Sequence, residues 1–252
     1  MLIRPGLELA NLTDTGLHRS QNQDYYCYAE PESEDEFLIK GRLAVIADGM
    51  GGHHGGEVAS RIAAERVRDV YLANPGSDPR ESLIVAFHDA HTSIQEYGRQ
   101  NPEFEGMGTT CTCVVLKDHQ LYYGHVGDSR LYLIRDGAIS LLTEDHSYVQ
   151  KLVRQGMLTS EEAASHPDRN ILTAALGMPA AVAADFSSEP IPLQSGDVLL
   201  LCTDGLHGLV SDQEVLARAA YEPPLQACRD LIQAAIERGG FDNITLQILR
   251  IA

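Results

Sequence analysis

Residues 43–57 read LAVIADGMGGHHGGE. The apolar run 43–47 predicts a buried strand, Asp48 follows at its end, and helical spacing begins at Val58. Between Asp48 and Glu57 stand five glycines, and glycine loses more conformational entropy on ordering than any other residue. The expected reason for them is close approach of the backbone to a ligand, and Asp48 suggests a metal ion. The alternative is a flexible turn that caps the next helix.

The composition is that of a globular protein large enough to bury a core. The chain has 252 residues, of which 44% are hydrophobic and 22% charged. No apolar run reaches the roughly 18 residues that a membrane helix needs, and the first ten residues lack the apolar core of a secretory signal. We therefore expect one domain over residues 1–252, monomeric, cytoplasmic and without membrane association.

The net charge of −17 argues against nucleic acid as the main partner, because phosphate backbones are bound by Lys and Arg. An anionic substrate would need bound cations to attract it, since an ion is often the largest local charge in a site. The five cysteines form no C-x-x-C pair and are read as buried free thiols.

The hydrophobic period changes several times along the chain. Helical spacing at 59–70 and 83–97 predicts two adjacent helices, and residues 109–142 read as an antiparallel meander. Residues 143–183 read as an inserted helical flap, and 30–36 as a solvated acidic loop. Because alternating βα units are absent, we expect an α+β fold of antiparallel sheets with helices packed outside.

Capping-box spacing marks two helix starts. Thr159 is followed three residues later by Glu162, and Ser211 by Glu214. We predict that a helix begins after each pair, the first within the flap and the second after the strand that ends near Cys202.

Four strand-like stretches each end in an aspartate next to glycine, serine or asparagine. These aspartates are Asp48, Asp128, Asp204 and Asp242. Each alone is as well explained by a turn, but the four together predict convergence at one end of a sheet. Gathered carboxylates repel one another unless cations lie among them. Mg or Mn, which prefer oxygen ligands, fit such a site, and two ions could share Asp48 with help from the Gly49 carbonyl.

The order of the motifs carries a resemblance. R-S-Q-N-Q-D, D-G-M-G-G-H, V-G-D-S-R, T-D-G-L and D-N-I-T resemble the metal-dependent protein phosphatases of the protein phosphatase 2C type, in particular the compact bacterial members. The match runs over about residues 9–248. It implies a four-layer αββα sandwich, two antiparallel β-sheets flanked by helices, with two metal ions at one end.

The resemblance also implies a role for each acidic motif residue. Asp48 resembles the ligand that bridges both metals, and Gly49 gives its carbonyl to one of them. Asp204 and Asp242 complete the other ion's shell. Asp24 resembles the acidic residue that holds a metal-bound water. Asp128 corresponds to a residue that, together with Asp204, holds a weaker third ion in bacterial members. Asn243 is expected to support the ligands from behind.

Arg19 resembles the arginine that binds phosphate, and a planar guanidinium suits two phosphate oxygens at once. His53 resembles the general acid that protonates the leaving alkoxide. His54 is expected to face solvent, although the sequence leaves open which of the two faces the substrate. His146 and His166 in the flap are read as structural caps, with substrate contact as the alternative, and residues 108–110 as support for the site.

The activity implied is hydrolysis of phosphoserine and phosphothreonine in proteins by direct attack of a metal-bridging hydroxide, without a phosphoenzyme. The partners would be phosphoproteins, the substrates of a Ser/Thr kinase. Two alternatives remain. One is a catalytically weak regulator that binds phosphoproteins, which is disfavoured because every motif carboxylate is present. The other is a phosphatase of an anti-sigma-factor antagonist or of small phosphorylated molecules.

Overall fold

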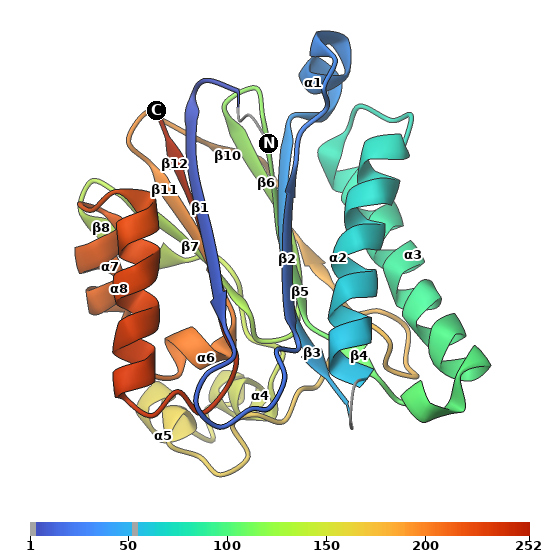
Figure 1. Ribbon diagram of the computed structural model, residues 1–252, viewed down its shortest axis with the longest axis vertical. Coiled ribbons are helices and arrows are strands. Elements are labelled where there is room, and N and C mark those ends of the chain that lie inside the picture. Colours follow the sequence, from blue (N-terminus) through green and yellow to red (C-terminus); the bar gives the residue numbers. More distant parts are fainter. Residues whose placement is uncertain (1–3, 52–54) are drawn as a thin grey trace.

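Two antiparallel sheets face each other in the computed structural model, which describes residues 4–51 and 55–252 (Figure 1). The first sheet has the order β1-β12-β11-β7-β8. Its strands are β1 Leu7–Asp14, β12 Ile244–Ile251, β11 Val198–Cys202, β7 Arg130–Arg135 and β8 Ala138–Leu141. The second has the order β10-β6-β5-β3-β2, with β4 beside β3 and β9 beside β6. Its strands are β10 Ile191–Pro192, β6 Gln120–Val126, β5 Cys111–Lys117, β3 Arg42–Met50, β2 Asp24–Ala29, β4 Gly108–Thr109 and β9 Asp185–Phe186.

Helices cover the outer face of each sheet. The long helices α2 (Gly55–Ala73) and α3 (Pro79–Gln100) pack on the second sheet, and a short 3-10 turn, η1 (Pro102–Phe104), follows them. On the first sheet lie α6 (Asp204–His207), α7 (Asp212–Ala219) and α8 (Pro224–Glu237). Separate apolar clusters fill the two helix–sheet interfaces and the space between the sheets. The predicted αββα sandwich is confirmed.

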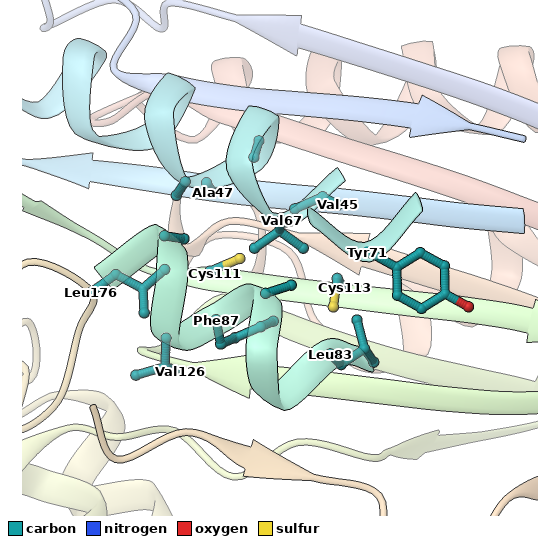
Figure 2. Packing of buried hydrophobic residues seen from close by; sticks show 14 of the residues in the cluster. Val45, Ala47, Val67, Tyr71, Leu83, Phe87, Cys111, Cys113, Val126 and Leu176 are labelled. Atoms are coloured by element: carbon teal, nitrogen blue, oxygen red, sulfur yellow. The ribbon is translucent and has the colours of Figure 1, made fainter. Parts of the chain in front are cut away.

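Strand β3 shows why residues 43–47 form a continuous apolar run. Val45 and Ala47 face α2 and α3, whereas Ala44 and Ile46 face the opposite sheet. A strand that is covered on both faces needs apolar residues at every position. Figure 2 shows the outer cluster, where the helices and the sheet interdigitate. Its labelled members include Val45, Ala47, Val67, Tyr71, Leu83, Phe87, Cys111, Cys113, Val126 and Leu176.

One polar side chain ties the two sheets together. Gln247 of β12 is fully buried, and its Nε2 donates to the carbonyl oxygens of Val45 at 3.0 Å and Cys27 at 3.3 Å on the facing sheet. Because buried polar groups are costly unless hydrogen-bonded, these contacts favour one relative position of the two sheets.

The prediction of one meander over 109–142 is wrong. Strands β5 and β6 pair in the second sheet, but β7 and β8 pair in the first. The chain crosses between the sheets at residues 127–129, where Gly127 has φ +107° and its α-hydrogen faces Thr110. Strands of either sheet show the same local alternation of apolar and polar residues. The sequence therefore does not show that the chain passes from one sheet to the other at this point.

The acidic loop predicted at 30–36 is partly helical. Helix α1 (Glu34–Lys40) starts after Ser33, whose hydroxyl accepts from the amide of Glu36. Lys40 at its end donates to the carbonyls of Asn74 and Gly76, beyond α2. Acidic residues near the N-terminus and lysine near the C-terminus both suit the helix dipole. The helix lies at the end of the sandwich away from α4 and α6 (Figure 1).

Both predicted capping boxes are present, at Thr159 before α5 (Ser160–Ala164) and at Ser211 before α7. Helix α4 (Tyr148–Arg154) and α5 belong to the segment between β8 and β9, which was read as the flap. In the described ranges, every helix is too short or too polar to cross a bilayer.

Candidate metal centre

Paired strands place two of the predicted aspartates side by side. Asp24 is the first residue of β2, Asp48 lies near the end of β3, and the two are direct cross-strand partners. Facing carboxylates on adjacent antiparallel strands repel each other and destabilise the pairing. The placement therefore indicates a function for the acids rather than a contribution to strand stability.

The facing sheet brings two more aspartates to the same end. Asp204 begins α6 directly after β11, and Asp242 lies two residues before β12. Strands β11 and β12 are neighbours, so both loops emerge together. Asp128, in the crossover between the sheets, contributes to the electrostatic field at Asp204 and Asp48. The predicted convergence of strand-end aspartates is thus present, with Asp24 as a fifth member.

Burial and mutual repulsion dominate the electrostatics of this acidic cluster. Burial raises the pKa of Asp48 well above its usual value, and the charges of Asp24 and Asp204 raise it further. Burial likewise raises the pKa of Asp24, Asp128 and Asp204. Carboxylates held in this way gain most from a cation placed among them.

Within the described ranges, no group of three Asp, Glu, His or Cys side chains already surrounds one point as metal ligands. Asp24 Oδ2 accepts from Thr203 at 2.9 Å. Four buried side-chain oxygens in the described ranges have no hydrogen-bond partner, and two of them, Asp24 Oδ1 and Asp204 Oδ1, belong to this cluster.

This donor set fits a hard divalent cation. All five members offer carboxylate oxygens, which Mg²⁺ and Mn²⁺ accept. Buried oxygens without a partner are costly, and an ion would satisfy them. We conclude that the cluster is a candidate metal centre.

Glycines next to the acids let separate backbone segments meet. A Cβ on Gly49 would lie 1.9 Å from the carbonyl oxygen of Gly56, so the first turn of α2 packs directly on the end of β3. A Cβ on Gly205 would lie 2.0 Å from the Asn243 carbonyl, and one on Gly16 2.2 Å from the Asp242 carbonyl. The expected close approach of backbone is real, but at these positions the approaching partner is the protein itself.

The backbone of Asp48 is held from the neighbouring strand. Its amide donates to Thr110 Oγ1 at 2.9 Å, and its carbonyl accepts from Thr109 Oγ1 and from the Thr110 amide, both at 2.8 Å. Residues 108–110 therefore support the site, in agreement with their reading from the sequence. The Gly49 carbonyl, predicted as a metal ligand, lies next to the first turn of α2, 2.6 Å from where a Gly56 Cβ would stand.

Asn243 pins the loop that connects β1 to β2. Its Nδ2 donates to the carbonyls of Thr15 and Gln21 at 2.9 Å, and its Oδ1 accepts from the amide of Gln23 at 2.8 Å. These three side-chain hydrogen bonds, among the described residues, all go to backbone, and they hold the loop that carries Arg19. The assignment of Asn243 as support behind metal ligands stays a prediction.

Arg19 reaches the cluster but is paired. Its Nη2 donates to Asp242 Oδ2 at 2.6 Å, while half of its side-chain surface stays exposed. The hydrogen bond to Asp242 raises its pKa, and the charges of Asp48 and Asp204 act in the same direction. The guanidinium that was predicted to bind phosphate therefore lies beside the acids with a face open to solvent.

The flap histidines make structural hydrogen bonds. His146 accepts at Nδ1 from the Gly127 amide at 3.3 Å, and its Nε2 lies 3.1 Å from Asp185 Oδ2. His166 accepts from the Asp168 amide at 3.1 Å. These contacts favour the structural reading of both residues. His53 and His54 lie outside the described residues.

Three supporting residues were missed from the sequence. Thr203 orients Asp24, and His207 Nε2 donates to the Asp128 carbonyl at 2.9 Å. Arg130 forms two hydrogen bonds to Asp145, at 3.0 and 2.8 Å, next to the crossover. Thr203 and Arg130 stand inside the T-D-G-L and V-G-D-S-R motifs, so their place in the motifs was the available signal. His207 carries no signal before the fold is known.

Comparisons with known proteins agree with this geometry. The family model described as "Protein phosphatase 2C" matches residues 19–235. A Streptococcus pneumoniae protein named "Protein phosphatase PhpP" is 36% identical over 250 residues, which are 96% of this chain and 97% of that protein.

Solved structures are similar over nearly the whole chain. The Mycobacterium tuberculosis serine/threonine phosphatase PstP/Ppp matches with a TM-score of 0.86 and 35% identity, over 97% of this chain and 98% of that one. The catalytic domain of PstP in complex with two manganese ions matches with a TM-score of 0.82 and 33% identity, over 98% of each chain.

Proposed function

Because this chain belongs to the protein phosphatase 2C family, we propose that its acidic cluster binds divalent cations and that it hydrolyses phosphoserine and phosphothreonine in proteins. The single observation that supports this most strongly is the meeting of Asp24, Asp48, Asp204 and Asp242 at one end of the sandwich. Burial raises the pKa of Asp24, Asp48 and Asp204 there, and one oxygen each of Asp24 and Asp204 has no hydrogen-bond partner. Relatives that share a third of the sequence are named serine/threonine phosphatases, and one is described with two manganese ions.

Asp48, Asp204 and Asp242 would hold the cations, with the Gly49 carbonyl as a further ligand and Asp24 oriented by Thr203. When bound, two such cations neutralise phosphoryl oxygens and make water nucleophilic near neutral pH. Mg²⁺ and Mn²⁺ both suit these oxygens, and we propose a weaker third site at Asp128 with Asp204.

The chain's own residues position and neutralise the substrate. Arg19 presents a half-exposed guanidinium beside the cluster, and this group can take two oxygens of an anionic phosphoryl group. His53 is proposed to give a proton to the departing serine or threonine oxygen. Asn243 and Thr110 keep the loops that carry Arg19 and Asp48 in place.

The surroundings of the enzyme are also proposed. We expect a cytoplasmic monomer that acts on the substrates of a Ser/Thr kinase. The net charge of −17 disfavours nucleic acid as a partner.

Turnover of a phosphothreonine peptide with Mn²⁺ tests the proposal. Asp48→Ala and Asp204→Ala should lose both turnover and Mn²⁺ binding measured by calorimetry. Asp69→Ala is the matched control, because Asp69 is half exposed and lies 14 residues along α2 from Gly55, about 21 Å away. If either site variant kept wild-type turnover, the assignment of the metal centre would be wrong. A wild-type protein that binds the peptide without turnover would instead be a regulator.

A further inference from the structure

Two large apolar side chains are exposed beside the acidic cluster. Phe241 is 58% exposed and Leu17 65% exposed. The ring of His18 lies 5.1 Å from the ring of Phe241, centroid to centroid. We call Leu17, His18 and Phe241 the apolar platform.

The platform is joined to the candidate site by the chain itself. His18 directly precedes Arg19, and Phe241 directly precedes Asp242. Arg19 and Asp242 form the ion pair at 2.6 Å, so the two loops meet there. Consecutive Cα atoms are about 3.8 Å apart, and the platform therefore begins one residue away from the groups assigned to phosphate and metal. The loop after β1 and the loop before β12 run together at this end of the molecule (Figure 1).

The platform is held in place by backbone. The Leu17 amide donates to the Gly240 carbonyl at 2.8 Å, and a Cβ on Gly240 would lie 3.2 Å from Leu17 Cγ. The ring of Phe241 folds over Gly239, where a Cβ would lie 2.4 Å from it. Gly239 has a φ of +121° and Gly240 a φ of +50°, both positive. A surface that is already ordered loses little entropy when a ligand covers it.

Single exposed apolar residues are ordinary, but rigid apolar residues adjoining a polar site are typical of ligand recognition. A polypeptide whose phosphorylated side chain reaches Arg19 must place its neighbouring residue about one residue's length away. An acidic neighbour would meet the repulsion of a chain of net charge −17. An apolar neighbour would bury Phe241 and Leu17 and avoid that repulsion.

We infer that the apolar platform of Leu17, His18 and Phe241 binds an apolar side chain immediately next to the phosphorylated residue of the substrate, an inference that rests on the proposed function. The platform thus selects phosphoproteins with a residue such as leucine beside the phosphothreonine. It is a specificity surface and takes no part in the chemical step.

The test uses two phosphothreonine peptides that differ only at both flanking positions, Leu in one and Ala in the other. The wild-type protein with Mn²⁺ should prefer the Leu peptide by about tenfold in kcat/KM, mainly through KM, which corresponds to about 1.4 kcal/mol. Phe241→Ala should reduce this ratio to about 1, and Leu17→Ala should lower it. Phe241→Leu should retain most of it. Because the result is a ratio within one variant, a general loss of activity does not affect it.

Tyr221→Ala is the matched control, since Tyr221 is 75% exposed but lies before α8, whose 14 residues span about 21 Å. It should keep the wild-type ratio. Equal kcat/KM for both peptides in the wild type, or an unchanged ratio in Phe241→Ala, would overturn the inference while leaving the proposed function intact. Failure to hydrolyse either peptide would overturn both. A dimer that dissociates in Phe241→Ala, seen by sedimentation, would assign the platform to a second copy of the chain.

Discussion

Lowering the pH should destabilise this protein through His125, a buried histidine of β6 that contacts the start of the flap. Its Nδ1 lies 2.8 Å from Thr112 Oγ1, and its Nε2 donates to the Glu144 carbonyl at 3.1 Å. The side chain is fully buried, and burial lowers its pKa from 6.5 to about 4, with the charge of His146 adding to the effect. Asp145 and Asp185 act in the opposite direction but do not offset the burial.

The sign follows from proton binding. Between pH 6.5 and 4 the unfolded chain takes up a proton at this histidine, whereas the folded chain does not. Stability from the neutral His125 is therefore fully present above pH 6.5, falls as the pH drops below 6.5, and is fully lost near the folded-state pKa of about 4. A pKa that falls from 6.5 to about 4 corresponds to a loss of about 3 kcal/mol in the free energy of unfolding.

Urea unfolding followed by circular dichroism at pH 7 and pH 4.5, with EDTA present throughout, measures this difference. His125→Gln keeps a donor for the Glu144 carbonyl but cannot titrate. Because pH 4.5 lies above the folded-state pKa, its loss of stability between pH 7 and pH 4.5 should be smaller than that of the wild type by about 2.5 kcal/mol. His88→Gln is the control, because His88 is exposed on α3 and should keep the wild-type difference. His207, whose pKa burial also lowers to about 4, remains in both variants. If His125→Gln lost as much stability as the wild type, the reasoning would be refuted.

Three further outcomes are expected. Phe87→Ala should lower the free energy of unfolding by about 3–5 kcal/mol in urea, because Phe87 is fully buried against α2 and the sheet; a change below about 1 kcal/mol would contradict the packing. Asp145→Asn should cost about 3 kcal/mol in the same assay, since it breaks the paired hydrogen bonds to Arg130, and wild-type stability would mean that this pair is unimportant. Gly205→Ala should weaken Mn²⁺ binding by about 10–100-fold in calorimetry, because its Cβ would stand 2.0 Å from the Asn243 carbonyl next to Asp242; unchanged affinity would show that the loop adapts freely.

Much of the site could be predicted because its acids stand at strand ends. An aspartate after an apolar run is visible in the sequence at Asp48 and Asp204, and the resemblance added Asp24 and Arg19. The capping boxes at Thr159 and Ser211 were readable for the same reason, since a cap involves residues three positions apart.

Other features depend on residues far apart in the chain. The pairing of Arg19 with Asp242 spans 223 positions, and the hydrogen bond from Thr203 to Asp24 spans 179. The glycines illustrate the same limit. Their number predicted close approach, but only the fold identifies the partner of Gly49 as Gly56 and that of Gly205 as the Asn243 carbonyl.

By itself, the sequence determined where most strands and helices form, although not α1, and which carboxylates stand at strand ends. Those properties follow from hydrophobic period and local hydrogen bonding, which act over a few residues. Only the tertiary structure decided that β6 and β7 lie in different sheets, and that Asp128 therefore lies in the turn that joins them. Both sheets bury alternating apolar residues equally well, so the choice between them is made by long-range packing.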